Sequence, residues 1–208
     1  MFLLGCLGIA AFVWASRIDL IPSKGYSDGD FQIATYHSPN DQDGDGIDDQ
    51  TDLLKGVKDY IATKPKYKSK YYATGYPDDG YGVCSDVVAF GLLGAGYDLQ
   101  ALVDGDVKEN PGLYDIDIPD ANIDFRRVRN LQVYFDHNAI TLTTDLGRID
   151  QFQGGDIVIF KNHIGIVSDL RNKDGVPFLI HHAGVFQLRY QENAMEKQGP
   201  VLGHYRIS

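Results

Sequence analysis

The chain has 208 residues and a formal net charge of −10, enough for one compact domain of ordinary size plus some additional sequence. Hydrophobic residues make up 43% of the chain, a proportion typical of globular proteins rather than disordered ones. The negative charge argues against nucleic acid as a partner, because binding to phosphates requires a basic surface. These numbers favour a globular enzyme or binding domain.

The chain begins with an apolar segment. Residues 2–15 read FLLGCLGIAAFVWA, which is short for a membrane span but has the length of a signal-peptide core. The small residue Ala15 before Ser16 suits signal cleavage, although the basic residues that usually precede such a core are missing. We therefore expect residues 1–15 to be a signal or membrane-anchor segment of an exported protein, secreted or held at the cell surface. A buried N-terminal helix is the alternative.

Residues 16–40 have mixed polarity and contain several helix and strand breakers, and they are predicted to be a linker. The breakers are Pro22, Gly25, Gly29 and Pro39.

An acidic loop follows the predicted linker. Residues 41–52 read DQDGDGIDDQTD and fit the spacing D-x-D-x-D-G-x-x-D-x-x-D, in which alternate aspartates direct their carboxylates at one cation. The loop resembles the calcium loops of EF-hands, dockerins and thrombospondin type 3 repeats, with Asp52 where an EF-hand usually has Glu. We expect a structural Ca²⁺, with a solvated acidic turn as the alternative. The predicted ligands are Asp41, Asp43, Asp45, the carbonyl of Ile47, Asp49 and Asp52.

The segments after this loop alternate between helical and irregular patterns. Apolar residues at helical spacing predict a helix from Asp49 to Ala62, so residues 41–62 form a loop-plus-helix unit. Residues 63–83 are predicted to be irregular, and a helix from Val83 to Leu93 is expected to end at the following glycines. The acidic stretch from Tyr97 to Asp124 has few periodic signals and is predicted to be a long loop. A short helix is expected from Arg127 to Asn138.

The last third of the chain carries strand patterns. Short apolar runs at 156–160, 164–168 and 177–181 are separated by turn residues, and 203–207 could add a fourth strand. Helices followed by an antiparallel sheet predict an α+β domain.

Cys84 is a candidate nucleophile. The only other cysteine, Cys6, lies in the apolar N-terminal segment, so a disulfide between the two is not expected. The start of a helix favours the thiolate over the thiol. Asp86 in the same turn opposes this effect, so a nearby base is required. A buried structural cysteine is the alternative.

Histidines in two consecutive predicted strands could supply that base. His163 precedes one apolar strand, and His181-His182 end the next. Residues of adjacent antiparallel strands can lie side by side on one face. One histidine could then take the proton of Cys84 while another orients its ring.

A resemblance to a known family supports this arrangement. Three runs resemble the G-D-φ…H-φ-G-φ…φ-H order of NlpC/P60-type papain-like cysteine peptidases, where φ is apolar: residues 154–158, 163–167 and 180–181. More closely, the chain resembles the DUF1287 family over roughly residue 52 to the C-terminus. The landmarks of that resemblance are residues 82–88, 122–131, 163–169 and 203–206.

The resemblance implies a papain-like hydrolase domain over residues 63–208, with a nucleophile helix packed on a small antiparallel sheet. It implies that Cys84 attacks an amide bond through an acyl-enzyme route, that His163 is the base, and that His181 orients it, with His182 as the second choice. The implied substrate is a peptidoglycan stem peptide or another cell-envelope peptide. NlpC/P60 enzymes typically read D-C-S-G where this chain has residues 83–86, so the substrate side of the site is expected to differ.

Candidate substrate-binding residues lie near the nucleophile in sequence or carry charges suited to a substrate carboxylate. They are Tyr81, Asp86, Asp124, Arg126 and Arg127. A buried ion pair that holds the long loop is an equally weighted reading of the Asp124–Arg127 run. Two functional alternatives stay open: a non-catalytic, calcium-stabilised binding module at the cell surface, and an acyltransferase with the same triad. In each case a monomer is expected.

Overall fold

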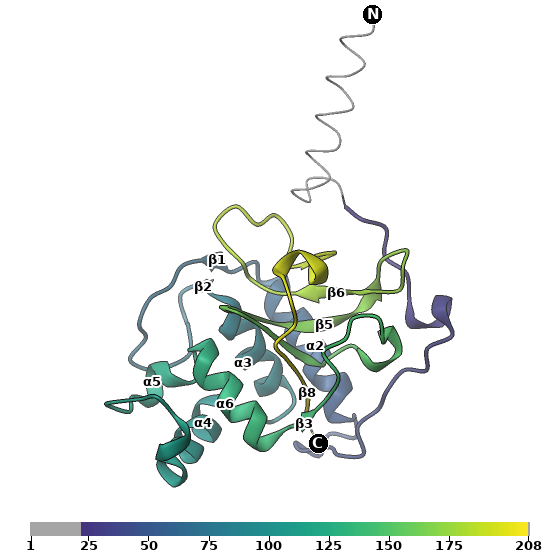
Figure 1. Cartoon of the computed structure of the whole chain (residues 1–208). Helices are drawn as coiled ribbons and strands as arrows, with labels where there is room; N and C mark the ends of the chain where they lie inside the picture. Colours follow the sequence, from purple (N-terminus) through teal and green to yellow (C-terminus); the bar gives the residue numbers. More distant parts are fainter. Residues whose placement is uncertain (1–21, 208) are drawn as a thin grey trace, which may run out of the picture.

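The computed structural model describes residues 22–207 (Figure 1). The expected signal or anchor segment, residues 1–15, lies outside the described residues.

A six-stranded antiparallel sheet forms the centre of the molecule (Figure 1), with the strand order β3-β8-β4-β5-β6-β7. The two central strands β4 and β5 form a hairpin in which Phe160 pairs with His163. A separate parallel pair, β1 and β2, directly precedes the helix that begins at Cys84. The strands are β1 (Lys66–Tyr67), β2 (Tyr81–Gly82), β3 (Ile140–Thr141), β4 (Ile157–Phe160), β5 (His163–Arg171), β6 (Pro177–Ile180), β7 (Gln191–Glu192) and β8 (Gly203–Arg206).

The α-helices lie on one side of this sheet (Figure 1). They are α2 (Asp49–Ala62), α3 (Cys84–Gly94), α4 (Leu99–Glu109), α5 (Ala121–Asp124) and α6 (Val128–Asn138). Short 3₁₀ turns are η1 (Asp28–Phe31), η2 (Pro111–Leu113), η3 (Ile149–Gln151) and η4 (Met195–Gln198). Within residues 22–207 no single helix is long and apolar enough to cross a membrane. The pair α3 and α4 reaches that length and composition together, but is bent by 101°.

Side-chain alternation along the strands gives the sheet two buried faces. Ile157 and Ile159 of β4 point toward the helices, whereas Val158 and Phe160 point to the opposite face, as expected when successive side chains alternate. The helix-side core also takes in Val87 and Val88 of α3, Leu53 and Val57 of α2, Leu131 and Phe135 of α6, and Ile164, Ile166, Ile180 and Tyr205 of the sheet. The confirmed fold class is therefore α+β with an antiparallel sheet.

Helices α2 and α3 approach each other closely because glycines face one another. A methyl group on Gly91 would lie 2.3 Å from a methyl group of Val57, and one on Gly56 would lie 3.0 Å from the backbone of α3. Since α2 shares its core with α3 and the sheet, the loop-plus-helix unit of residues 41–62 and the following residues form one packed body.

The prediction of a long loop between Tyr97 and Asp124 is wrong. Helix α4 occupies Leu99–Glu109, where Asp98 caps the N-terminus by accepting hydrogen bonds from the backbone of Gln100 and Ala101. Its buried residues Leu99, Val103 and Val107 recur every fourth position and fill the core. Acidic residues on the solvent side of the same helix obscure this narrow apolar stripe in the sequence.

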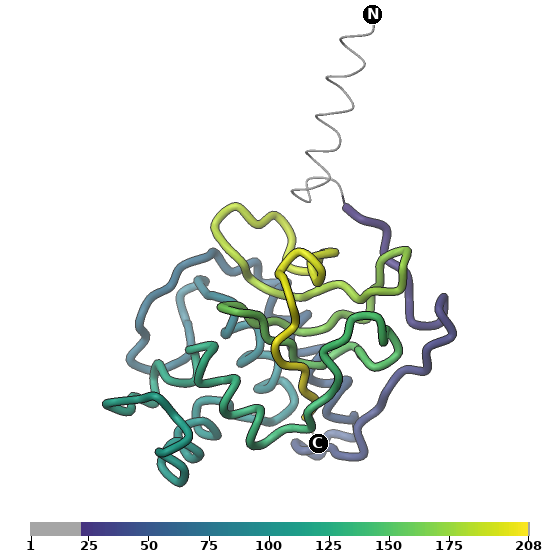
Figure 2. Tube along the Cα trace, in the orientation of Figure 1, coloured from purple at the N-terminus to yellow at the C-terminus, as the bar shows by residue number. Residues whose placement is uncertain are grey.

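The segment from residue 22 to residue 40, predicted to be a linker, runs along the outside of the domain toward α2 (Figure 2). It is anchored at Arg171, whose side chain is fully buried. Arg171 forms a β-bridge with Tyr26 and an ion pair with Asp28. The same guanidinium donates to the carbonyls of Ile149 and Phe152. These contacts hold the segment against the end of β5.

Candidate active site

Cys84 is the first residue of α3, and its sulfur meets the start of β5. The carboxylate of Asp86 accepts a hydrogen bond from the backbone N–H of Val83, at 2.8 Å, and so closes the helix N-terminus. The backbone N–H groups of Ser85 and Ile164 lie close enough to the thiol of the half-buried Cys84 to lower its pKa. Ile164 directly follows His163 in the chain, so the helix start meets the backbone next to the predicted base. Among the described residues, no hydrogen bond joins the side chains of Cys84 and His163.

His163 is the first residue of a hydrogen-bonded chain of three side chains. Its Nε2 lies 2.7 Å from Nδ1 of His181, and Nε2 of His181 lies 3.0 Å from a carboxylate oxygen of Glu192. Among the described residues, no hydrogen bond reaches Nδ1 of His163. Of the two histidines left open by the sequence, His181 is therefore the one that contacts His163.

The carboxylate at the end of this chain determines which ring nitrogens carry protons. A carboxylate only accepts hydrogen bonds, so Nε2 of His181 donates to Glu192. In a neutral His181 the other nitrogen, Nδ1, then accepts from Nε2–H of His163. Nδ1 of His163 is left with a lone pair, as a general base requires.

Burial keeps the predicted nucleophile and base uncharged. Burial, together with the neighbouring charges of His181 and His182, lowers the pKa of His163 from its ordinary 6.5 to about 4. Burial also raises the pKa of the Cys84 thiol, although the hydrogen bonds from Ile164 and Ser85 act in the opposite direction. The helix start was expected to favour a thiolate, but desolvation outweighs that effect. The resting pair is a thiol and a neutral imidazole.

Glu192 is the member of this chain that sequence reasoning missed. It lies in the two-residue strand β7, which is too short to give an alternating pattern and pairs with β6 beside His181. The amide of Gln187 donates to both the carboxylate of Glu192, at 2.9 Å, and the carbonyl of His181. The loop that contains Gln187 thus supports the orientation of the histidine chain.

Two cavities lie near this chain of side chains, and only the larger one has walls from it, at His181 and Glu192. One of about 350 Å³ is lined by Tyr67, Tyr81, His182 and Tyr190, and the other, of about 470 Å³, includes His181 and Phe186. Both share walls from β1 and from the loop of residues 183–190. A further cavity of about 420 Å³, between residues 27–37 and α2, has no wall from the histidine chain.

His182 faces the smaller cavity and not the neighbouring ring of His163. Its ring lies edge-on to Tyr67 and Tyr190, with centroids 5.3 and 5.1 Å away. Its Nδ1 is buried and has no hydrogen-bond partner among the described residues. Burial lowers the pKa of His182 to about 4, so this ring offers a neutral donor or acceptor to a molecule in the cavity.

Of the predicted substrate-binding residues, Tyr81 lines this cavity, whereas Asp86 and Arg126 bind each other. The Arg126 guanidinium makes two hydrogen bonds to the Asp86 carboxylate, at 2.7 and 2.9 Å, and a third to the carbonyl of Lys70. Both side chains are almost fully buried. The pair holds the start of α3 to the preceding segment and leaves neither charge available to a substrate.

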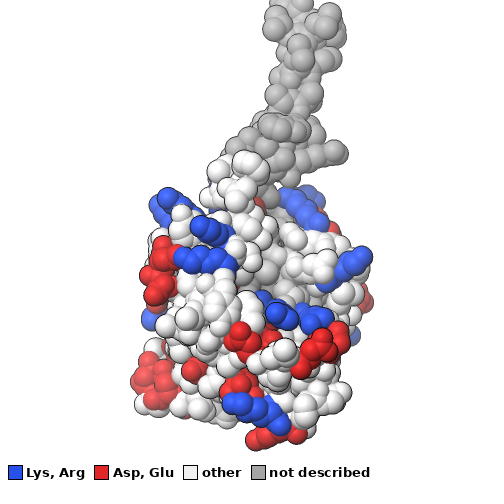
Figure 3. All heavy atoms as spheres, turned by 90° about the vertical axis from the view of Figure 1, so that its left-hand side faces the viewer, with Lys and Arg blue, Asp and Glu red and all other residues white. Residues whose placement is uncertain are grey.

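The remaining two candidates lie away from the cavity walls. Asp124 is buried and accepts a hydrogen bond from the backbone N–H of Asp120, which closes the short helix α5. Arg127 is exposed at the start of α6. The Asp124–Arg127 run could either bind substrate or hold the chain together, and Asp124 and Arg126 fit the structural role. Basic and acidic side chains are interspersed on the side of the molecule shown in Figure 3.

The predicted calcium ligands are brought together only in part. Carboxylate oxygens of Asp41, Asp43 and Asp45 lie within 4.8 Å of one another. The two oxygens of Asp49 instead accept hydrogen bonds from the backbone of Gln42, at 2.7 Å, and from the hydroxyl of Tyr97, at 2.6 Å.

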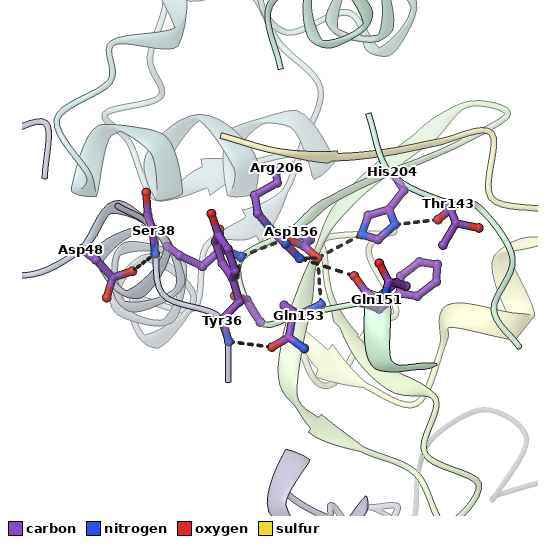
Figure 4. A network of polar contacts seen from close by, with 12 residues as sticks. Tyr36, Ser38, Asp48, Thr143, Gln151, Gln153, Asp156, His204 and Arg206 are labelled. Carbon is purple, nitrogen blue, oxygen red and sulfur yellow. Dashed lines mark hydrogen bonds and ion pairs between the residues drawn. The ribbon is translucent and has the colours of Figure 1, made fainter. Parts of the chain in front are cut away.

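A second histidine cluster surrounds Asp156, at the start of β4 (Figure 4). Its carboxylate accepts hydrogen bonds from His204, Arg206, Gln50 and the backbone of Gln153, at 2.7–3.0 Å. Asp156 and His204 are fully buried. This network joins the Gly154–Asp156 and Gly203–Arg206 runs of the sequence to α2 and has a structural role.

Comparison with known proteins places the chain in a family. The family model described as "Domain of unknown function (DUF1287)" matches residues 54–207. The chain is also 38% identical over 167 residues to the "Uncharacterized protein YijF" of Escherichia coli (strain K12), a match that covers 74% of this chain and 80% of that protein. No solved structure matches the chain. The chain therefore belongs to the DUF1287 family.

Proposed function

We propose that this protein is a cysteine hydrolase that cleaves an amide bond, with Cys84 as nucleophile. The observation that carries the proposal is the arrangement of side chains at the start of β5. The Cys84 sulfur lies against the backbone of Ile164, and the adjacent His163 begins the hydrogen-bonded chain that ends at Glu192.

The uncharged resting pair implies general-base catalysis. As the Cys84 sulfur bonds to the substrate carbonyl carbon, its proton passes to Nδ1 of His163. His163 then gives that proton to the leaving amine as the carbon–nitrogen bond breaks. Water, deprotonated by the same imidazole, attacks the thioester, and its proton returns to Cys84 when the acid is released.

The other groups around the sulfur would stabilise this sequence of steps. His181 and Glu192 hold the His163 ring and favour its positive charge while it carries the extra proton. Backbone N–H groups at the start of α3 would donate to the oxyanion that forms on the substrate. Both roles depend on the fixed position of α3, which the Asp86–Arg126 pair provides.

We propose that the domain belongs to the NlpC/P60-like group of papain-like cysteine peptidases. The order of the Cys84, His163 and His181 motifs and the packing of α3 against the antiparallel sheet support this proposal. From this placement we propose a peptidoglycan stem peptide, or another cell-envelope peptide, as the substrate. An exported location and attachment through residues 1–15 would bring the enzyme to that substrate.

The cavities beside the histidine chain suit a peptide. Tyr67, Tyr81 and Tyr190 give the smaller cavity aromatic walls. On the adjoining loop Val185, Phe186 and Leu188 are 68%, 92% and 64% exposed. An apolar loop of this kind would cover a bound substrate and gain contact area when it does so.

Stem peptides released from purified cell wall, followed by mass spectrometry, test the proposal. We expect the protein to convert one peptide into two shorter products, with a new amine and a new carboxyl group, and the Cys84→Ala variant to leave it intact. Transfer of the acyl group to an added amine, without net hydrolysis, would assign the same residues to an acyltransferase.

A non-catalytic binding module is the second candidate, because the Cys84 thiol is desolvated and its pKa is raised. Under that function, wall fragments would bind without being cleaved, and Cys84→Ala would bind them as tightly as the unchanged protein.

A further inference from the structure

The acidic loop of residues 41–52 gathers negative charge that no described cation neutralises. Asp41, Asp43 and Asp45 are exposed, and their carboxylate oxygens lie within 4.8 Å of one another. Among the described residues, no Lys or Arg forms an ion pair with any of the three. Like charges at this separation repel one another and destabilise the loop unless a cation lies between them.

A fourth carboxylate, on Asp52, lies in the first turn of α2, next to the loop that carries this cluster. Asp52 is only 5% exposed, and no hydrogen bond to its carboxylate is found within residues 22–207. The negative charges of Asp45, Asp43 and Asp41 act on this carboxylate. The neighbouring Lys55 pairs with Asp59 instead, at 3.2 Å. A buried carboxylate without a partner costs free energy unless an ion binds it.

We propose that residues 41–52 bind one Ca²⁺ through the carboxylates of Asp41, Asp43, Asp45 and Asp52. The backbone carbonyl of Ile47, which accepts no backbone hydrogen bond among the described residues, supplies a further oxygen. Calcium prefers six to eight oxygen ligands in a flexible arrangement, and this set with one or two waters provides them. Magnesium requires a smaller octahedral shell and keeps several waters, so it binds more weakly here.

Asp49, at the ninth position of the loop, has another function. Its oxygens accept hydrogen bonds from the backbone of Gln42 and from the Tyr97 hydroxyl. This position often acts through a water in loops of this spacing. A water-mediated role is therefore part of the proposal for Asp49, which the sequence predicted as a ligand.

The proposed site lies against the far end of the nucleophile helix. The backbone and Cβ of Asp43 pack on Gly96, where a methyl group would lie 3.0 Å from the Cβ of Asp43. Gly96 has a φ of +80°, in the turn that follows α3, and Tyr97 in the same turn binds Asp49. A cation that orders the loop therefore supports the turn at the C-terminal end of α3.

Calorimetric titration and thermal unfolding of the protein, after removal of metal with EDTA, test the site. We expect one Ca²⁺ per chain, a melting temperature that rises with Ca²⁺ concentration, and weaker binding of Mg²⁺. Asp43→Asn and Asp52→Asn should each weaken Ca²⁺ binding by about tenfold or more, since the charge of the ligands sets the affinity. Asp78→Asn, at an exposed position outside the loop, is the matched control and should bind as the unchanged protein does.

Absence of Ca²⁺ binding at millimolar concentration overturns the proposal. Equal affinity for Mg²⁺, or unchanged affinity in Asp43→Asn, overturns it as well. Asp43 is exposed, and asparagine has its shape, so this variant keeps the test valid if Asp52→Asn fails to fold. Both readouts are independent of catalysis, so the calcium site and the hydrolase activity can fail separately.

Discussion

Two histidine–carboxylate clusters lie in the same sheet, one around Asp156 and the other from His163 to Glu192. They differ in whether every ring nitrogen of their histidines has a hydrogen-bond partner. At Asp156, both ring nitrogens of His204 are hydrogen-bonded, to Asp156 and to the carbonyl of Thr143. The His204 ring also stacks on Phe152, with centroids 4.1 Å apart. Arg206 closes the remaining side of the carboxylate.

In the hydrogen-bonded chain from His163 to Glu192, one ring nitrogen has no partner within residues 22–207, at the His163 end. Nδ1 of His163 has no hydrogen-bond partner among the described residues, and His181 borders a cavity. The same residue types therefore give a structural brace at Asp156 and a candidate proton relay at His163. Access and an unpaired lone pair, more than the presence of histidine and carboxylate, distinguish a site that can react.

The largest effect on catalysis is expected for His163→Ala. Removal of the general base should lower the acylation rate of Cys84 by about 10²–10⁴-fold. Stability should change little in comparison, because His163 lies at the end of a strand. Rates measured with an activated ester, beside the exposed His137→Ala as control, check this. Equal rates in both variants would exclude His163 as the base.

The largest effect on stability is expected for Asp156→Ala. It would leave His204 and Arg206 buried without their carboxylate and should lower the free energy of unfolding by about 3–5 kcal/mol. Urea unfolding measures this loss, with Asp174→Ala, which breaks the exposed ion pair with Lys173, as the control that should change little. A loss as small as that of the control would mean that the network does not brace the sheet.

A smaller effect is expected for Glu192→Gln. A glutamine can hold His181 in either tautomer, so the orientation of His163 becomes mixed, and the acylation rate should fall by about 10–100-fold, as for other carboxylates that orient a histidine. The exposed Glu109→Gln, at the end of α4, is the matched control. An unchanged rate and pH profile would restrict Glu192 to a structural role.

The pH dependence of the acylation rate distinguishes the buried His163 from a histidine with an ordinary pKa. Because burial and the charges of His181 and His182 lower the pKa of His163 to about 4, its base form persists in acid, and acylation should decline only as pH approaches 4. An ordinary histidine would give a decline near 6.5. His181→Ala removes one of those charges and should move the decline upward. An acid limb near 6.5 in the unchanged protein would contradict this environment.

The same shift has a consequence for stability, with a definite sign. The unfolded chain takes up a proton at the His163 imidazole below about pH 6.5, whereas the folded chain resists it down to about pH 4. The free energy of unfolding should therefore fall as pH drops through this window. His163→Ala should flatten the decline, which unfolding curves at several pH values can resolve.

Much of the fold could be predicted from the sequence because its signals are local. The apolar spacing of α2 and the short apolar runs of β4, β5 and β6 mark these elements directly. Helix α4 was missed because its buried stripe is narrow, with acidic residues around it. The anchoring of residues 22–40 could not be seen, since it depends on Arg171, more than a hundred residues away.

In the candidate site, too, some residues give local signals in the sequence, and others can be identified only in the folded structure. Cys84 at a helix start and His163 at a strand start are local signals, and the choice between His181 and His182 needed the sheet register. Glu192 gives no signal, because its role arises only from the pairing of β6 with β7. Burial also raises the pKa of the Cys84 thiol, which the sequence could not show, since desolvation depends on the whole packed structure.

Formation of an acyl-enzyme tests the central claim most directly. After reaction with p-nitrophenyl acetate, the intact mass of the protein should show one acetyl group, which peptide mapping should locate at Cys84. The acetyl group should form more slowly in His163→Ala and not at all in Cys84→Ala. Acetylation elsewhere, or at Cys84 with a rate independent of His163, would contradict the assignment of Cys84 and His163 as nucleophile and base.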